Sequence, residues 1–323
     1  MNRKTPKVLL SAVVLLAAWS TSADIAAANT RLVRQGTPHD ILYGIAAGNS
    51  GLLAVGTAGL LLRSTDGESW EYDQLPTDGR SLFSVATAGA LSVAVGQEGI
   101  ILVNTDPAGM PGSWETVPSP TTERLFSVAV DNSGNAAAVG SFGTVLVSTS
   151  SGRHWRALAI DWEKLIDQPY EPHIYKVAFD QQGRLLISGE FGMIARSEDL
   201  GESWTLLRKG DASVFDLTLS GASTIYAVGQ DGEVLHSADA GRNWRRIETT
   251  TNGVLLDAVL QEGNRLTVFG LRENLKHKKE STEILESAQP DSELGNGWYT
   301  DSAVFRNAHY IVGQQGRIVR IDD

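Results

Sequence analysis

One short phrase recurs along the chain at nearly constant spacing and constrains the fold more than any other feature. It reads AVGTAGLLLRS from residue 54 and AVGQDGEVLHS from residue 227. The first glycines of the aligned copies, separated by 40, 44, 49, 40, 41 and 43 residues, are Gly56, Gly96, Gly140, Gly189, Gly229, Gly270 and Gly313. A period of about 40–50 residues is typical of propeller blades, each a four-stranded sheet. Seven copies therefore predict an all-β, seven-bladed β-propeller over residues 29–323.

Each copy has the same internal order of predicted strands. An apolar strand such as LFSVA at 82 comes first, the Val-Gly phrase ends the second strand, and a glycine turn leads into the third. The last copy stops at residue 323 after three strands. Residues 30–36, TRLVRQG, sit where a fourth strand stands in other copies. We therefore expect this segment to complete the seventh blade and close the ring, which removes exposed sheet edges.

A second motif recurs between the predicted third and fourth strands. It reads SEDLGESW at 197–204 and SADAGRNW at 237–244, with variants before Trp70, Trp114 and Trp155. Asp and Ser side chains can bond nearby backbone N–H groups and fix a turn. Tryptophan can bury a large apolar area between neighbouring sheets. Because five copies on successive blades cannot converge on one site, the motif indicates a fold repeat rather than catalysis.

The sixth copy departs most from the pattern. Residues 273–297 contain no copy of the Ser-Asp-Gly-Trp motif, here called the Asp box, and no tryptophan at the turn. Their length is close to that of the other copies. We therefore predict LKHKK and TEILESA as the third and fourth strands of this blade, rather than an inserted domain.

Residues 1–28 have the order of a secretory signal peptide. Three basic residues precede the apolar run 8–19, and small residues follow it, with Ala23 or Ala28 as cleavage points. The apolar run has 12 residues, against about 20 for a spanning helix. A retained N-terminal anchor is the alternative. The pattern predicts a periplasmic or secreted protein.

Charge and cysteine content limit the classes of partner. The chain has a formal net charge of -11 and no cysteine. Removing Arg3, Lys4, Lys7 and Asp24 with the signal takes away +2 and leaves -13. An acidic surface disfavours nucleic acid and anionic lipid as partners. Disulfides and lipid anchors on cysteine are excluded.

The repeat pattern resembles the Asp-box, or BNR, propellers. Within them it is similar to the photosystem II stability and assembly factors and their bacterial homologues, over residues 30–323. LFSVA, AVGQDGEVLHS and SADAGRNW match the order of that family's blades. The resemblance implies a seven-bladed, exported, non-enzymatic factor that binds membrane-protein intermediates. The basic patch of that family does not map onto any motif of this acidic chain.

The alternative function is an exported glycoside hydrolase of the sialidase type. That chemistry needs an arginine triad beside a Tyr/Glu pair and an acidic Asp. The chain offers Arg31, Arg34, Arg80 and Arg124, without the phrase that normally carries the first arginine. Its six histidines do not pair at metal-ligand spacing, and no nucleophile elbow or phosphate loop occurs. We therefore predict no catalytic residue, no metal and no cofactor.

Loops on one face of the ring are the predicted binding surface, because function usually lies on loops of a rigid scaffold. Phe142 and Phe191 are apolar residues at turns between second and third strands, and they either bind a partner or plug the channel mouth. The long segment 157–173 carries Trp162 and Tyr170, either as interface anchors or with Trp162 packed down in a short helix. The predicted contact residues of a monomeric propeller for a membrane-protein complex or its assembly intermediate are Phe142, Trp162, Tyr170, Glu190, Phe191, Gln230 and Asp231.

Overall fold

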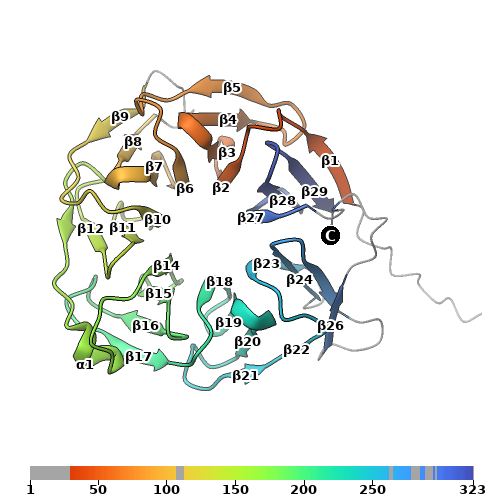
Figure 1. The fold of residues 1–323 in the computed structure, drawn as a ribbon. Helices are drawn as coiled ribbons and strands as arrows, with labels where there is room; N and C mark the ends of the chain where they lie inside the picture. Colours follow the sequence, from red (N-terminus) through yellow and green to blue (C-terminus); the bar gives the residue numbers. More distant parts are fainter. Residues whose placement is uncertain are drawn as a thin grey trace, which may run out of the picture.

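Seven small sheets surround a common axis in the computed structural model, which describes residues 30–106, 113–261, 265–277, 284–287, 294 and 297–322. The blades follow one another around the ring in chain order, as the colours from red to blue show (Figure 1). The predicted seven-bladed β-propeller is therefore confirmed. The predicted signal peptide, residues 1–28, lies outside the described residues.

The first three blades each consist of four antiparallel strands. Blade 1 contains β2 (Leu42–Gly48), β3 (Gly51–Gly56), β4 (Leu60–Ser64) and β5 (Glu71–Gln74). Blade 2 contains β6 (Leu82–Ala88), β7 (Leu91–Gly96), β8 (Ile101–Asn104) and β9 (Glu115–Val117). Blade 3 contains β10 (Leu125–Val130), β11 (Ala136–Gly140), β12 (Val145–Ser148) and β13 (Arg156–Ala157).

Blades 4 and 5 have the same order, and helix α1 (Trp162–Ile166) lies in the connection before blade 4. Blade 4 contains β14 (Ile174–Phe179), β15 (Leu185–Gly189), β16 (Ile194–Ser197) and β17 (Thr205–Arg208). Blade 5 contains β18 (Val214–Ser220), β19 (Thr224–Gly229), β20 (Val234–Ser237) and β21 (Arg245–Arg246). Short 3-10 turns follow three second strands, at Thr57–Gly59, Gln97–Gly99 and Gln230–Gly232.

Blade 6 has a fifth strand that the repeat did not predict. It contains β23 (Leu255–Gln261), β24 (Arg265–Gly270), β25 (Asn274–His277) and β26 (Ile284–Ser287). The predicted third and fourth strands are therefore present. The segment WRRIETT, which follows the Asp box of blade 5, divides at the buried Ile247, and its second half, β22 (Glu248–Thr249), pairs in parallel with β26. This pairing covers the outer edge of blade 6.

The N-terminal strand closes the ring as predicted. Blade 7 contains β27 (Tyr299–Phe305), β28 (Ala308–Gly313), β29 (Ile318–Asp322) and, at its outer edge, β1 (Thr30–Arg34). Thr30 pairs with Ile321, and Leu32 pairs with Val319. Arg31 and Arg320 both bind Glu68 in the Asp-box turn of blade 1, with N–O distances of 2.6 Å. Strands β1 and β29 are thus both tied to the first blade.

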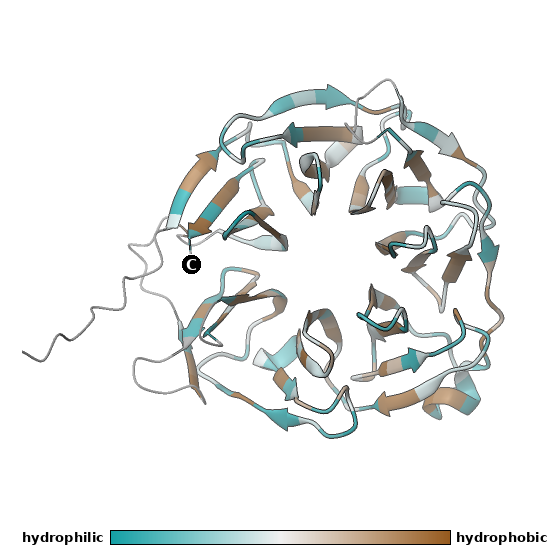
Figure 2. Cartoon of the chain, turned by 180° about the vertical axis from the view of Figure 1, so that it is seen from behind, coloured by the Kyte–Doolittle hydropathy of each residue, from teal (hydrophilic) through white to brown (hydrophobic). Residues whose placement is uncertain are grey.

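The core lies between neighbouring blades. Every residue of the second strands β3, β7 and β28 is buried. Burying one Leu or Ile side chain contributes about 1.5–3 kcal/mol. Many hydrophobic residues, among them Leu62 and Ile187, are buried in this way. Figure 2 shows the apolar colour gathered on the strands and hydrophilic colour on many of the loops and outer strands. The fold therefore needs no disulfide to hold the ring.

Each Asp box stabilises its own turn, as the motif predicted. Asp199 Oδ1 accepts from the Ser203 backbone N–H at 2.9 Å, and Ser197 Oγ accepts from the Gly201 N–H at 2.7 Å. The second full copy repeats both bonds at 2.8 and 2.9 Å. Gly201 has a φ of +90°, and a side chain there would meet Leu158 of the preceding blade. The glycine is required by both the backbone and the packing.

The tryptophans of these turns are buried to different depths. Trp114 is 4% exposed, whereas Trp204 is only partly buried against the core between blades 3 and 4. The prediction that Trp204 is buried between blades therefore holds only in part. The turn that carries it lies at the rim of the sheet, so one side of the indole faces outward.

The antiparallel order of the strands gives the ring two distinct faces. Turns between second and third strands and connections between blades lie on one face, here called the upper face. Asp-box turns and the hairpins between first and second strands lie on the opposite, lower face. The residues predicted to bind a partner all belong to loops of the upper face.

Candidate functional site

Aromatic side chains form a belt around the axis near the upper face. They occupy the second position of the innermost strands in five consecutive blades: Tyr43, Phe83, Phe126, Tyr175 and Phe215. Neighbouring ring centroids along the belt are 5.3, 6.4, 5.8 and 4.8 Å apart. Distances of 4.5–7 Å are those at which aromatic pairs attract one another. Burial, followed by the nearby Glu190, raises the pKa of Tyr175 to about 12, so this phenol stays neutral at physiological pH.

The belt reaches the surface through His173 and Phe142. The His173 ring lies 6.3 Å from Phe126 and 4.9 Å from Phe142, which is 58% exposed. The Phe142 backbone N–H donates to His173 Nδ1 at 3.1 Å, so the neutral imidazole carries its proton on Nε2. We call Phe142, His173 and Phe126 the aromatic strip. It leads from an exposed turn of blade 3 down to the wall around the axis.

A cavity of about 490 Å³ lies beside the aromatic strip, between blades 2, 3 and 4. Phe126, Phe142 and His173 form its apolar side. Glu98, Glu123 and Arg124 are the charged residues of its lining. A wall that combines aromatic rings with a few charged groups is typical of a binding site for a peptide or small molecule.

Two of the predicted contact residues are bulky aromatic residues with strained backbones. Phe142 has a φ of +50° and Phe191 a φ of +57°, in the left-handed region that bulky residues avoid. The same turn position is occupied by Glu98, Asp231 and Gln315 in other blades. Keeping a bulky aromatic residue there costs of order 1 kcal/mol. Strain at an exposed aromatic residue favours a functional rather than a structural reason for its presence.

The remaining predicted residues on the upper face lie near the strip but not all within it. Tyr170 is 57% exposed and its ring lies 5.6 Å from that of Phe191. Glu190 Oε2 accepts from the His173 backbone N–H at 2.8 Å and so positions the histidine. Gln230 and Asp231 are exposed on the corresponding turn of blade 5, and Gln230 Oε1 accepts from the Ser213 N–H at 3.1 Å.

Trp162 does not offer a contact surface. It is 6% exposed and packs in the core between blades 3 and 4. Helix α1 begins after Asp161, whose side chain accepts from the Lys164 N–H at 3.0 Å. The indole lies so close to Gly143 that a side chain there would collide with it. Of the two alternatives, the short helix with Trp162 packed down is therefore the correct one. Burying the large apolar indole in the core stabilises the fold more than exposing it would.

Sequence reasoning missed most of the aromatic belt. Its residues were visible as the second letter of LYGIA, LFSVA, IYKVA and VFDLT, but each reads singly as an ordinary apolar strand residue. His173 carried no motif at all. The aromatic identity at one repeat position in five consecutive copies was the signal that could have found the belt.

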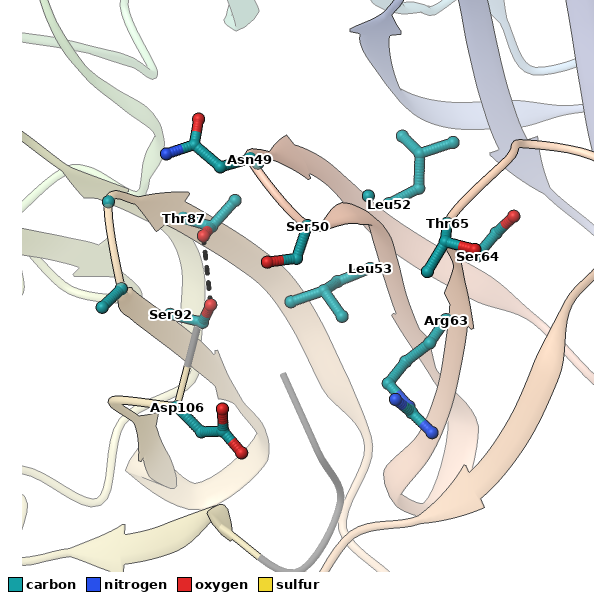
Figure 3. Close-up of a pocket in the computed structure, with 14 residues that line it drawn as sticks. Asn49, Ser50, Leu52, Leu53, Arg63, Ser64, Thr65, Thr87, Ser92 and Asp106 are labelled. Atoms are coloured by element: carbon teal, nitrogen blue, oxygen red, sulfur yellow. Dashed lines mark hydrogen bonds between the residues drawn. The ribbon is translucent and has the colours of Figure 1, made fainter. Parts of the chain in front are cut away.

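A recess on the lower face, between blades 1 and 2, is too small for a substrate. Its volume is about 40 Å³, little more than one water. Figure 3 shows Arg63 and Asp106 at its rim and the hydrogen bond of 3.1 Å between Ser92 and Thr87. Arg63 is paired with Glu71 and Asp73. Ser92, Thr87 and Arg63 are therefore already bonded to other protein groups.

The arginines considered for a sialidase site do not meet. Arg31 pairs with Glu68 on the outer rim, and Arg34 donates to the Gly316 carbonyl at 2.7 Å. Arg80 bonds within the connection between blades 1 and 2, while Arg124 lines the upper cavity. Among the described residues, no group of three or more His, Asp or Glu side chains is arranged to hold a metal ion. Within the same residues no helix is long and apolar enough to cross a membrane.

The fold and the aromatic strip define a class: a seven-bladed propeller with a candidate binding site on its upper face. No model of a known protein family matches the sequence, and no curated protein matches it. Similar solved structures do exist. YCF48 bound to D1 peptide covers 93% of this chain and 96% of that chain, with a TM-score of 0.70 and 16% identity.

Two further structures show how widely this fold is used. YCF48 from Cyanidioschyzon merolae has a TM-score of 0.73 and 17% identity, covering 92% of this chain and 99% of that chain. Virginiamycin B lyase from Staphylococcus aureus has a TM-score of 0.71 and 10% identity, covering 92% and 100%. At these identities the similarity establishes the propeller fold, which both binding proteins and enzymes share.

Proposed function

We propose that this chain is an exported, non-enzymatic propeller whose upper face binds a segment of a membrane protein or of its assembly intermediate. The observation that carries the proposal is the aromatic strip beside the cavity of about 490 Å³. Exposed aromatic side chains are enriched in protein interfaces and often dominate their binding energy. Phe142 keeps such a side chain 58% exposed in a strained turn.

Two further observations support this function. A propeller with the same fold, YCF48, has been solved with a D1 peptide bound. The N-terminal segment has the order of a signal peptide, which places the mature chain where segments of membrane proteins emerge on the far side of the inner membrane. The proposed role is assembly or stabilisation of such a complex, as the resemblance to the photosystem II factors implies.

Site-specific crosslinking tests the binding face directly. A photoreactive phenylalanine analogue replaces Phe142 in the full chain. The chain is produced in its native host, and crosslinking is carried out in the envelope. We expect crosslinks to an integral membrane protein. The matched control carries the analogue at Tyr72, which is 61% exposed on the outer strand of blade 1. The same products from both positions, or none from position 142, would contradict the proposal.

A substitution separates binding from folding. Phe142→Gly removes the aromatic ring at a left-handed position that glycine adopts without strain, so the variant should melt at or slightly above the wild-type temperature. We expect it to lose the membrane-protein partner, whereas Tyr72→Ala keeps it.

The mass of the mature chain recovered from the envelope checks export, since cleavage after Ala23 or Ala28 removes the N-terminal segment.

A further inference from the structure

The third residues of the innermost strands form a ring around the axis, one level below the aromatic belt. In blade order they are Gly44, Ser84, Ser127, Lys176, Asp216, Asp257 and Asp301. Three of them link neighbouring blades by accepting a backbone N–H: Ser84 from Val128, Ser127 from Val177, and Asp301 from Ile45. All the charge of this ring is therefore gathered in blades 4 to 7, as three carboxyl groups and one ammonium group.

The ammonium group of Lys176 forms ion pairs with two of the three carboxyl groups. Lys176 Nζ lies 2.6 Å from Asp216 Oδ1 and 3.8 Å from Asp301 Oδ1. The two carboxyl side chains are 4% and 18% exposed. Burial alone would lower the pKa of Lys176, but Asp216, Asp301 and Asp257 outweigh it and raise that pKa above the ordinary lysine value. Lys176 is thus a fixed cation.

Asp257 is the carboxyl group that remains. It is 4% exposed, and its Oδ2 atom has no hydrogen-bond partner among the residues that the structure describes. The nearby Ser302 side chain lowers the pKa of this carboxyl slightly, against the larger effects that raise it. A buried polar atom without a partner destabilises the fold, so its presence needs an explanation such as an ion or a ligand.

A cavity of about 250 Å³ opens from Asp257 towards the lower face. Its lining includes Thr218, Ser302 and His309 together with Val304, which is 60% exposed and marks the outer end. At about 30 Å³ for each water molecule in the liquid, the space is large enough for a short alkyl chain with a charged head. It is separated from the upper cavity by the ring and the aromatic belt.

The electric field in this cavity favours a positive group. Burial, and then Asp216 and Asp301, raise the pKa of Asp257 well above its usual range. Burial likewise raises the pKa of Asp301 to about 6, against the Lys176 charge and the Ile45 N–H, which lower it. A cation at Asp257 would therefore displace a proton. The other titratable groups that line the cavity or the ring above it are Lys176 on β14, Asp216 on β18, Asp301 on β27 and His309 on β28.

We propose that this lower cavity binds the N–H head of an alkylammonium or alkylguanidinium cation, with Asp257 Oδ2 as its anionic partner. Such a head supplies the N–H donor that the unpartnered oxygen lacks, and the pair would be a charge-assisted hydrogen bond. The carboxylates are not arranged to hold a metal ion. The site lies on the face opposite the proposed protein-binding surface and does not depend on that function.

Calorimetric titration of the full chain with n-butylammonium chloride tests the site. We expect saturable binding that tightens as the pH rises, with release of protons on binding. Asp257→Asn should weaken binding at least about tenfold. Asp211→Asn makes the same substitution in an exposed upper-face loop and should leave binding unchanged. Equal affinity of the Asp257→Asn variant and wild type would overturn the proposal.

Further arms identify the cation and guard against misfolding. Val304→Trp alters an exposed residue and should lower the affinity by narrowing the entrance, even if the Asp257 variant folds poorly. Potassium chloride and n-butanol at the same concentrations should fail to compete; competition by either would refute an N–H cation site. A Gly-Lys-Gly peptide capped at both ends distinguishes the sources. If it binds, the cation can be a protein side chain; if only butylammonium binds, it is a free amine.

Discussion

Two rings of equivalent positions behave in opposite ways in this molecule. On the outer rim, the Asp-box carboxylates Asp66, Asp199 and Asp239 each bond their own turn, and these bonds lower the pKa of all three to about 2. Around the axis, the third residue of the inner strand changes from Gly44 to serine, lysine and aspartate, and its contacts differ from blade to blade.

In a repeat protein, positions that differ from blade to blade are better candidates for function than positions that repeat. The rim repeats one residue type in blades 1, 4 and 5 because their Asp-box turns need the same hydrogen bonds. At the axis, the third residues of the seven inner strands lie close together but have different neighbours. The residue type at this position can therefore differ from blade to blade. Gly44 illustrates the point: a side chain there would lie 2.9 Å from the Ser84 Cα of the next blade, whereas Lys176 has room to reach Asp216.

The largest expected effect is at the axis. Lys176→Met leaves Asp216 and Asp301 buried without their cation, and we expect a loss of about 3 kcal/mol at neutral pH, the lower end of the range for breaking a buried ion pair because the lysine is 26% exposed. Urea unfolding measures it. Lys209→Met, at a lysine 53% exposed, is the control and should change stability little. A similar loss in both variants would show that the ion pair at the axis contributes no more to stability than an exposed one.

The rim should respond in the same way at equivalent positions. Trp204→Ala and Trp244→Ala each remove a half-buried indole, at about 2–3 kcal/mol, below the ~3–5 kcal/mol of a fully buried one. The Trp244 variant should lose slightly more stability, because Trp244 Nε1 donates to the Gly241 carbonyl at 3.0 Å, while Trp204 Nε1 has no partner within the described part of the chain. Chemical unfolding of both variants tests this equivalence. Very different losses would show that the rim is not repetitive.

Asp257→Asn should stabilise the protein, by less than the losses above. The pKa of Asp257 is raised in the folded state, so the wild type gives up stability as pH rises above the unfolded pKa of about 4. Asparagine does not titrate, so the variant keeps its stability over this pH range. The gain in melting temperature should therefore be largest near neutral pH and shrink towards pH 4. A gain independent of pH, or a loss at neutral pH, would contradict the assignment.

The smallest effect belongs to a single Asp box. Asp199→Ala should lower the melting temperature by a few degrees and leave partner binding intact. The folded pKa of Asp199 is depressed to about 2 by its bonds to Ser203 and Ser197. Its contribution is therefore fully present above the unfolded pKa of about 4 and is lost as pH falls through about 2. Melting curves over that range should converge for the two proteins, and Asp239→Ala should behave alike.

Much of the fold followed from local pattern. Seven Val-Gly phrases predicted seven blades, TRLVRQG predicted the closing strand, and SEDLGESW predicted a turn, since each depends on residues close together in the chain. The departure of β22 from blade 5 was not predictable, because it depends on an open edge of blade 6 about 35 residues later. The depth of Trp162 also depended on a distant element, the turn at Gly143.

The candidate sites divide along the same line. The sequence alone determined that exposed aromatic residues, Phe142 and Tyr170 among them, stand on upper-face loops. The tertiary structure decided that Phe142 joins His173 and Phe126 in one strip, and that Lys176, Asp216, Asp257 and Asp301 meet at the axis. The four charged residues are spread over about 125 positions of the chain and share no motif. Only closure of the ring brings them together, because charge interacts through space and not along the sequence.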